Sequence, residues 1–153
     1  GYSQSINFTL EDEATGKEIY GTKFNVKSER GIISLKLPSA APPLKVGQQY
    51  RWRFVFDCGD GPEDLSVDGV VERMAPSNSL TSQLNSATTA MERINIYGKN
   101  GLWHETITEL GNLRRSVPDD VAIAARWKSL LEQDYIRFPD YDLTLEKIQN
   151  CCN

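Results

Sequence analysis

The chain has 153 residues and a mass of 17.2 kDa, enough for one compact domain or for two small ones that share an interface. Its 39% hydrophobic and 25% charged residues are typical of globular proteins, and no apolar run approaches the ~20 residues that span a bilayer. The net charge is −4, and division before Ser77 places 9 of the 17 basic and 11 of the 21 acidic residues in the first part, so each part carries −2. Neither part has the positive excess that nucleic-acid binding requires, and we expect no nucleic-acid partner.

The first 43 residues predict three short strands. Ile6–Leu10 and Ile19–Val26 alternate between apolar and polar residues and flank the acidic, glycine-containing segment Glu11–Lys17, which predicts a hairpin. A third strand is predicted from Gly31 onwards, before the proline-rich connection Pro38–Pro43. The apolar residues expected to share one face of this third strand are Ile33, Leu35 and Leu37.

A second hairpin is predicted within Leu44–Met74. Aromatic residues alternate with other residues from position 50 to position 56, a period of two that places them on one face of a strand. These aromatic residues are Tyr50, Trp52, Phe54 and Phe56. The turn-forming run Asp57–Pro62 follows, and then a second strand at Leu65–Met74. We expect the aromatic face to be core, with both halves of the chain packed onto it.

Helical spacing of apolar residues replaces this alternation from Asn78 onwards. The predicted helices cover residues 78–85, 87–99, 102–115, 118–133 and 142–148. The first is expected to be capped by Asn78 or Ser79 and the second by Ser86 or Thr88, and Asn100-Gly101 is a stop signal. An aromatic loop, Tyr135–Tyr141, precedes the last helix.

The predicted fold is therefore α+β. An antiparallel, sandwich-like sheet of five to six strands occupies residues 1–76, and a bundle of four to five helices occupies residues 77–153. We expect the two halves to pack together as one compact unit.

Part of the helical half resembles a tetratricopeptide unit, a helix–turn–helix with a period of 34 residues. Tyr97, Gly101, Thr106, Leu110 and Pro118 stand at the family's tyrosine, turn, small, large apolar and closing proline positions. The signature of the first helix is missing, since the residues at its Trp, Leu and Gly positions are Ala90, Arg93 and Ile94. The resemblance implies a helical hairpin of a type that other proteins use to bind peptides.

A second resemblance covers nearly the whole chain. It rests on Gly31-Ile-Ile-Ser-Leu35, Leu44-Lys-Val-Gly47-x-x-Tyr50-x-Trp52-x-Phe54, Cys58, Val67-x-Gly69-x-Val71-x-Arg73, Tyr97-x-x-x-Gly101-Leu-Trp103-x-Glu105 and Leu110-x-x-Leu113-Arg-Arg115. These motifs are similar to those of a cyanobacterial family known as domain of unknown function nine-two-eight. The resemblance implies a strand-rich first half, a helical second half and an export signal ahead of the domain, and hence a periplasmic or extracellular location. It implies no catalytic residue.

Few residues are candidates for chemistry. His104 is the only histidine, and the adjacent Cys151 and Cys152 lack the spacer with which paired cysteines hold zinc. A disulfide from Cys58 to Cys151 or Cys152 is one prediction, and three free thiols are the alternative. The acidic segment 57–64 does not match a calcium-binding loop, and no nucleophile or zinc-protease motif is present. We therefore expect no cofactor, no metal and no enzymatic activity.

The favoured hypothesis is a non-enzymatic protein-interaction module of the cell envelope, which binds another protein through its helical half. The expected contact residues are Trp103, His104, Tyr135 and Tyr141. One alternative is binding of carbohydrate or another envelope polymer, which requires that at least two of four rings be exposed and coplanar, namely Tyr50, Trp52, Phe54 and Trp103. A third hypothesis is a hydrolase with a dispersed site, in which His104 lies in a cleft beside a Ser, a Cys or a carboxylate.

Overall fold

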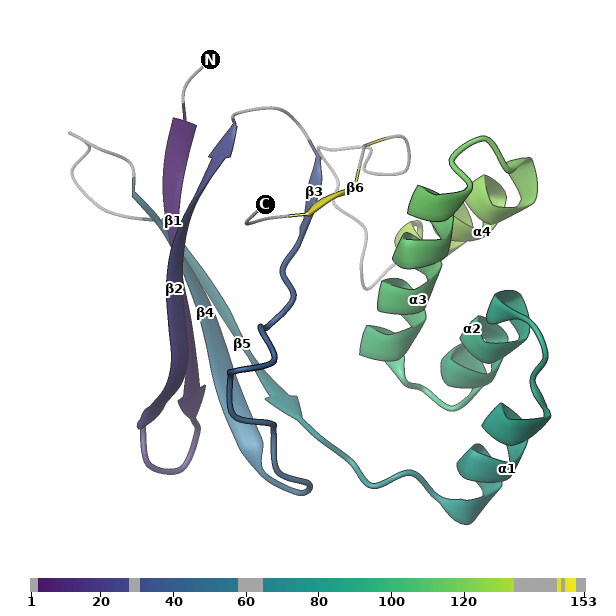
Figure 1. Ribbon diagram of the computed structural model, residues 1–153, viewed down its shortest axis with the longest axis horizontal. Helices are drawn as coiled ribbons and strands as arrows, with labels where there is room; N and C mark the ends of the chain where they lie inside the picture. Colours follow the sequence, from purple (N-terminus) through teal and green to yellow (C-terminus); the bar gives the residue numbers. More distant parts are fainter. Residues whose placement is uncertain (1–2, 28–30, 58–64, 134–145, 147, 151–153) are drawn as a thin grey trace. The chain divides into compact units, whose positions relative to one another are not determined.

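The computed structural model describes residues 3–27, 31–57, 65–133, 146 and 148–150 (Figure 1). Its elements are β1 (Ser3–Asp12), β2 (Glu18–Lys27), β3 (Ile32–Ser34), β4 (Gln49–Asp57), β5 (Leu65–Glu72), α1 (Asn78–Ser86), α2 (Ala90–Lys99), α3 (Trp103–Ser116), α4 (Val121–Leu131) and β6 (Ile148–Asn150). The chain divides into a strand unit, which extends to Ala75 and takes in the chain end from Gln149, and a helical unit, Pro76–Ile148. The predicted α+β class, with an antiparallel sheet before the helices, is confirmed.

Four strands form one antiparallel sheet in the order β2-β1-β4-β5. Both predicted hairpins are present, β1–β2 and β4–β5, and they join where β1 pairs with β4. Phe8 stands opposite both Thr22 and Phe54, so the apolar residues of β1 share a face with the aromatic residues of β4. The buried residues of this face are Ile6, Phe8, Leu10, Phe24 and Tyr50.

The aromatic face of β4 is part of this core. Tyr50 is only 2% exposed, and the other three aromatic residues of the strand are partly buried against the same cluster. Leucines from the connection between β3 and β4 pack on this face, namely Leu35, Leu37 and Leu44. The second sheet layer of a sandwich stays a prediction.

The third predicted strand is shorter than expected, and its partner comes from the far end of the chain. β3 pairs with β6 in a separate two-stranded sheet. Ile33 is 42% exposed whereas Leu35 and Leu37 pack on the core after the strand has ended, so the common face predicted for these three residues is wrong. Most of the predicted helix 142–148 lies outside the described residues, but Ile148 begins a strand, so a helix through Ile148 is wrong. Pairing with a partner distant in the sequence overrides local preference here.

Three helices begin at capping side chains. The Ser77 hydroxyl accepts a hydrogen bond from the Leu80 amide of α1, at 3.1 Å, and Thr89 forms a capping box with Glu92 at the start of α2. In both cases the cap lies one residue away from a predicted candidate. Asp120 caps α4 by accepting from two backbone amides. Hydrogen bonds from the amides of Thr88 and Thr89 hold the pKa of Glu92 below its usual value.

The turn between α2 and α3 ends the first helix sharply, as predicted. Gly101 adopts a φ of +71°, and the Leu102 amide donates to the Tyr97 carbonyl at 3.0 Å while the Gly101 amide donates to Gly98 at 3.2 Å. This hydrogen-bond pattern is the Schellman motif, which a glycine in the left-handed conformation permits. A Cβ at Gly98 would lie at an ordinary contact distance of 3.8 Å from the Thr106 side chain, so α2 and α3 leave room for a methyl group there.

Candidate functional site

Helices α2, α3 and α4 enclose a groove in the helical unit, with a volume of about 410 Å³. This volume lies toward the small end of the roughly 300–1,000 Å³ found for ligand pockets. The lining residues are Asn95, Gly98 and Lys99 from α2, Gly101 from the turn, Trp103, Thr106 and Leu110 from α3, and Arg126, Ser129, Leu130 and Gln133 from α4 and its C-terminal end. Figure 1 shows the three helices beside one another.

The α3 side of the groove is largely apolar. Leu110 is 1% exposed and Thr106 is 5% exposed. The Thr106 hydroxyl donates to the Leu102 carbonyl at 2.7 Å, so this buried polar group is already satisfied within the helix. Trp103, the first residue of α3, is half-buried and adds an aromatic surface. Leu130 adds an apolar side chain from α4.

Two basic residues give the groove a positive charge. Lys99 is the last residue of α2, and Arg126 lies on α4, so the folded helices bring the two side chains to one groove. One Nη of Arg126 donates to Oδ1 of Asn95 at 2.9 Å, which links α4 to α2 and orients the guanidinium. Within the described part of the chain, no Asp or Glu lines the groove, and neither Lys99 nor Arg126 is paired with a carboxylate. The positive groove stands out in a chain of net charge −4.

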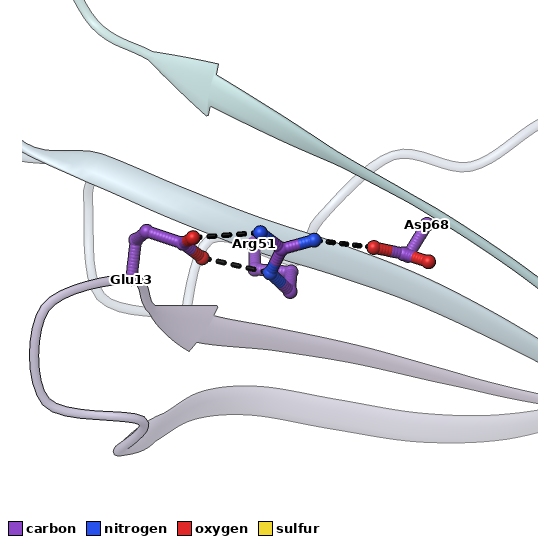
Figure 2. Close-up of polar contacts among 3 residues, drawn as sticks. All are labelled: Glu13, Arg51 and Asp68. Atoms are coloured by element: carbon purple, nitrogen blue, oxygen red, sulfur yellow. Dashed lines mark hydrogen bonds and ion pairs between the residues drawn. The ribbon is translucent and has the colours of Figure 1, made fainter.

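On the polar face of the sheet, by contrast, the cation Arg51 is already paired with carboxylates (Figure 2). Arg51 of β4 donates through Nε and Nη2 to the two Glu13 oxygens, at 2.8 and 2.6 Å, and through Nη1 to Asp68 of β5. The hydrogen bonds with Arg51 lower the pKa of Glu13, and those with Glu13 and Asp68 raise the pKa of Arg51. This cluster ties the β1–β2 turn to β4 and β5, and its guanidinium is occupied by two carboxylates.

The residues expected to contact a partner are only partly placed. Trp103 lines the groove, whereas His104 is exposed and is not among the lining residues. Tyr135 and Tyr141 lie outside the described residues. The cysteines of the predicted disulfide, Cys58 with Cys151 or Cys152, also lie outside them.

Sequence reasoning missed the two cations of the groove, Lys99 and Arg126. The sequence indicates where Lys99 lies, because Lys99 directly precedes the Asn100-Gly101 stop signal and is therefore expected at the end of a helix. No such indication exists for Arg126, because only the packing of α4 on α3 decides which residues of α4 reach the groove.

The rings of β4 do not form the flat pair that the carbohydrate hypothesis requires. Tyr50 is buried, and the rings of Trp52 and Phe54 are 5.9 Å apart at 62°, an edge-to-face contact. Within the residues that the structure describes, no group of three or more His, Cys, Asp and Glu side chains could hold a metal ion. Among these same residues, none of the helices has the length and apolar character to cross a membrane.

Comparison with known proteins places the chain in a family. The family model described as Domain of Unknown Function (DUF928) matches residues 2–138, so the chain belongs to this family. No curated protein and no solved structure matches it.

Proposed function

We propose that this member of the DUF928 family is a non-enzymatic interaction module that binds a segment of another protein in the groove between α2, α3 and α4. The observation that carries the proposal is the groove itself, which combines a largely apolar side, the aromatic Trp103 and two cations without carboxylate partners among the described residues. Its volume of about 410 Å³ suits a few side chains of a peptide better than a whole helix.

Two polar side chains of the groove, Asn95 and Ser129, can supply hydrogen bonds to a bound segment. Ser129 and Asn95 lie on opposite walls, and Asn95 retains its amide N–H donors after accepting from Arg126. Both can bond to the backbone of a bound segment, while the partly exposed Trp103 and Leu130 contact its apolar side chains. This division of roles gives specificity through polar groups and affinity through apolar burial.

The tetratricopeptide-like interpretation of α2 and α3 belongs to the same proposal. The Schellman turn at Gly101 supports it, since Gly101 stands at the turn position of that family. We also propose a location in the cell envelope. Fractionation of cells that express the full-length protein tests the location, and recovery in the cytoplasm would contradict it.

A substitution that fills the groove tests whether the groove is the binding site. Ser129 is exposed on α4 and lines the groove, so Ser129→Trp should fill it without disturbing the core. Ala125→Trp is the matched control, because Ala125 is exposed on the same helix and does not line the groove. We expect binding to an array of short random peptides to fall at least tenfold in Ser129→Trp alone. Equal binding by both variants would contradict the proposal, and glycan binding unaffected by either would favour the carbohydrate hypothesis.

A further inference from the structure

We infer that the groove selects a segment in which a carboxylate lies next to an apolar side chain, and that Lys99 and Arg126 together bind the carboxylate. This inference rests on the proposed function and adds the chemistry of the partner. The ligand class is an acidic peptide, either with an Asp or Glu side chain or with a free C-terminus.

The first argument is charge complementarity. Two cations line one concave surface, and among the described residues no carboxylate lines it or is paired with either cation. Charges of one sign concentrated in a cleft with apolar walls focus the electrostatic field on a ligand of the opposite sign. A neutral or basic segment would leave both cations of the groove uncompensated.

The second argument is the orientation of Arg126. Its hydrogen bond to Asn95, at 2.9 Å, uses one Nη of the guanidinium, directs the group toward α2 and leaves its other N–H donors available. The planar fork that remains matches the two oxygens of a carboxylate, and the flexible Lys99 ammonium can add a further charge-assisted bond from α2. Orientation before binding lowers the entropy lost when the ligand arrives.

Other cations of the described residues are engaged in different ways. Arg51 is held by two carboxylates, Lys128 pairs with Glu132 at 3.6 Å, and Arg93 lies 5.9 Å from the Tyr97 ring centroid and donates to its hydroxyl. Lys99 and Arg126 differ from these because they share a concave site.

The third argument concerns what accompanies the carboxylate. Leu130 and Trp103 present partly exposed apolar surface to the groove, and a small anion such as phosphate would leave this surface in contact with water. A peptide places an apolar side chain there, and each buried methylene contributes about 0.8 kcal/mol. Two cations in a chain of net charge −4 also suit a single carboxylate better than a polyanion.

The test uses matched peptides. The peptides captured by the random array are resynthesised with each Asp or Glu replaced by Asn or Gln, and separately with an amidated C-terminus. We expect one of these changes to weaken binding about tenfold, the loss of one charge-assisted hydrogen bond. The two syntheses distinguish a side-chain carboxylate from a terminal one.

Protein variants complete the test. Lys99→Gln and Arg126→Gln should each weaken binding of the acidic peptide about tenfold and reduce its advantage over the amide version, whereas Lys128→Gln on the same helix as Arg126 should leave both unchanged. All three side chains are exposed, so the variants should fold, which circular dichroism can verify.

The outcomes separate the two claims. Equal binding of acidic and amide peptides, with binding still blocked in Ser129→Trp, would overturn the inference and leave the proposed function standing. Acidic preference that persists in both groove variants would also overturn the inference. Absence of any peptide binding that depends on the groove would overturn both.

Discussion

Replacement of Gly69 by alanine should destabilise the strand unit, because the Trp52 indole lies over this glycine. Gly69 pairs with Trp52 across β4 and β5, and a Cβ at Gly69 would lie 2.5 Å from Cζ2 and 2.8 Å from Cε2 of the ring. These distances are well below van der Waals contact, so the indole must shift. It cannot do so freely, because it packs edge-to-face against Phe54 at 5.9 Å.

The expected cost follows from two opposing effects. Overpacking of this kind typically costs about 1–3 kcal/mol, and replacement of glycine by alanine returns about 0.4–1 kcal/mol by restricting the unfolded chain. The net loss in the free energy of unfolding should be about 1–2 kcal/mol, measured by urea denaturation followed by circular dichroism.

A matched control makes this reasoning refutable. Gly98→Ala introduces the same methyl group in α2, where the nearest atoms lie at an ordinary 3.8 Å, and should stabilise the protein by up to about 1 kcal/mol. In a Trp52→Leu background the penalty of Gly69→Ala should largely disappear. Wild-type stability of Gly69→Ala, or an unchanged penalty in that background, would refute the steric explanation.

Three further predictions concern the helical unit, and urea denaturation measures each. Leu110→Ala removes a side chain that is 1% exposed and should lower the free energy of unfolding by about 2–5 kcal/mol. Val121→Ala, at a position that is 83% exposed, should change it by less than about 0.5 kcal/mol. Equal effects of the two substitutions would contradict the assigned core. Gly101→Ala forces a side chain into a φ of +71° and should cost about 1–2 kcal/mol, and no loss would contradict the Schellman turn. The pKa of Glu92 is lowered, chiefly by the Thr88 amide, so its contribution to stability is present above its ordinary pKa of 4.5 and lost as the pH falls through the folded value. The stability difference between wild type and Glu92→Gln should therefore shrink on acidification, and a constant difference would show that ionisation of Glu92 contributes nothing.

Local patterns predicted each of the four strands of the antiparallel sheet, because each strand alternates between a core face and a solvent face, although the expected sheet had five to six strands. Tyr50 and Phe54, for example, can share the core with Phe8 only if β4 is extended. The alternation of residues with a period of two predicts this extended conformation. The sequence pattern did not predict that β3 pairs with β6, because this pairing joins distant parts of the chain. The groove is invisible for the same reason, since only tertiary packing brings Arg126 of α4 to Lys99 of α2.

Several motif residues that carried the family resemblance prove to be architectural. The Tyr50 hydroxyl accepts from the Lys45 amide at 2.9 Å, and Gly47, with a φ of +76°, donates its amide to the Arg73 carbonyl at 2.8 Å. Arg73 in turn donates to the Leu44 carbonyl at 2.9 Å. These contacts fasten the loop before β4 to the end of the second hairpin. The motifs of the strand unit are therefore explained by the fold, whereas those of the helical unit include three residues that line the groove, Gly101, Trp103 and Leu110.

The tryptophans offer the most direct test of where a ligand binds. The chain has three, of which Trp103 lines the groove, Trp127 is buried at 1% exposure in α4, and Trp52 lies on the sheet. Their indole N–H signals can be followed by NMR while an acidic peptide from the array is added to the ¹⁵N-labelled protein. Binding in the groove predicts a saturable shift of the Trp103 signal with the Trp52 signal unchanged. A shift confined to Trp52, or no shift at either residue, would contradict the assignment of the groove as the binding site.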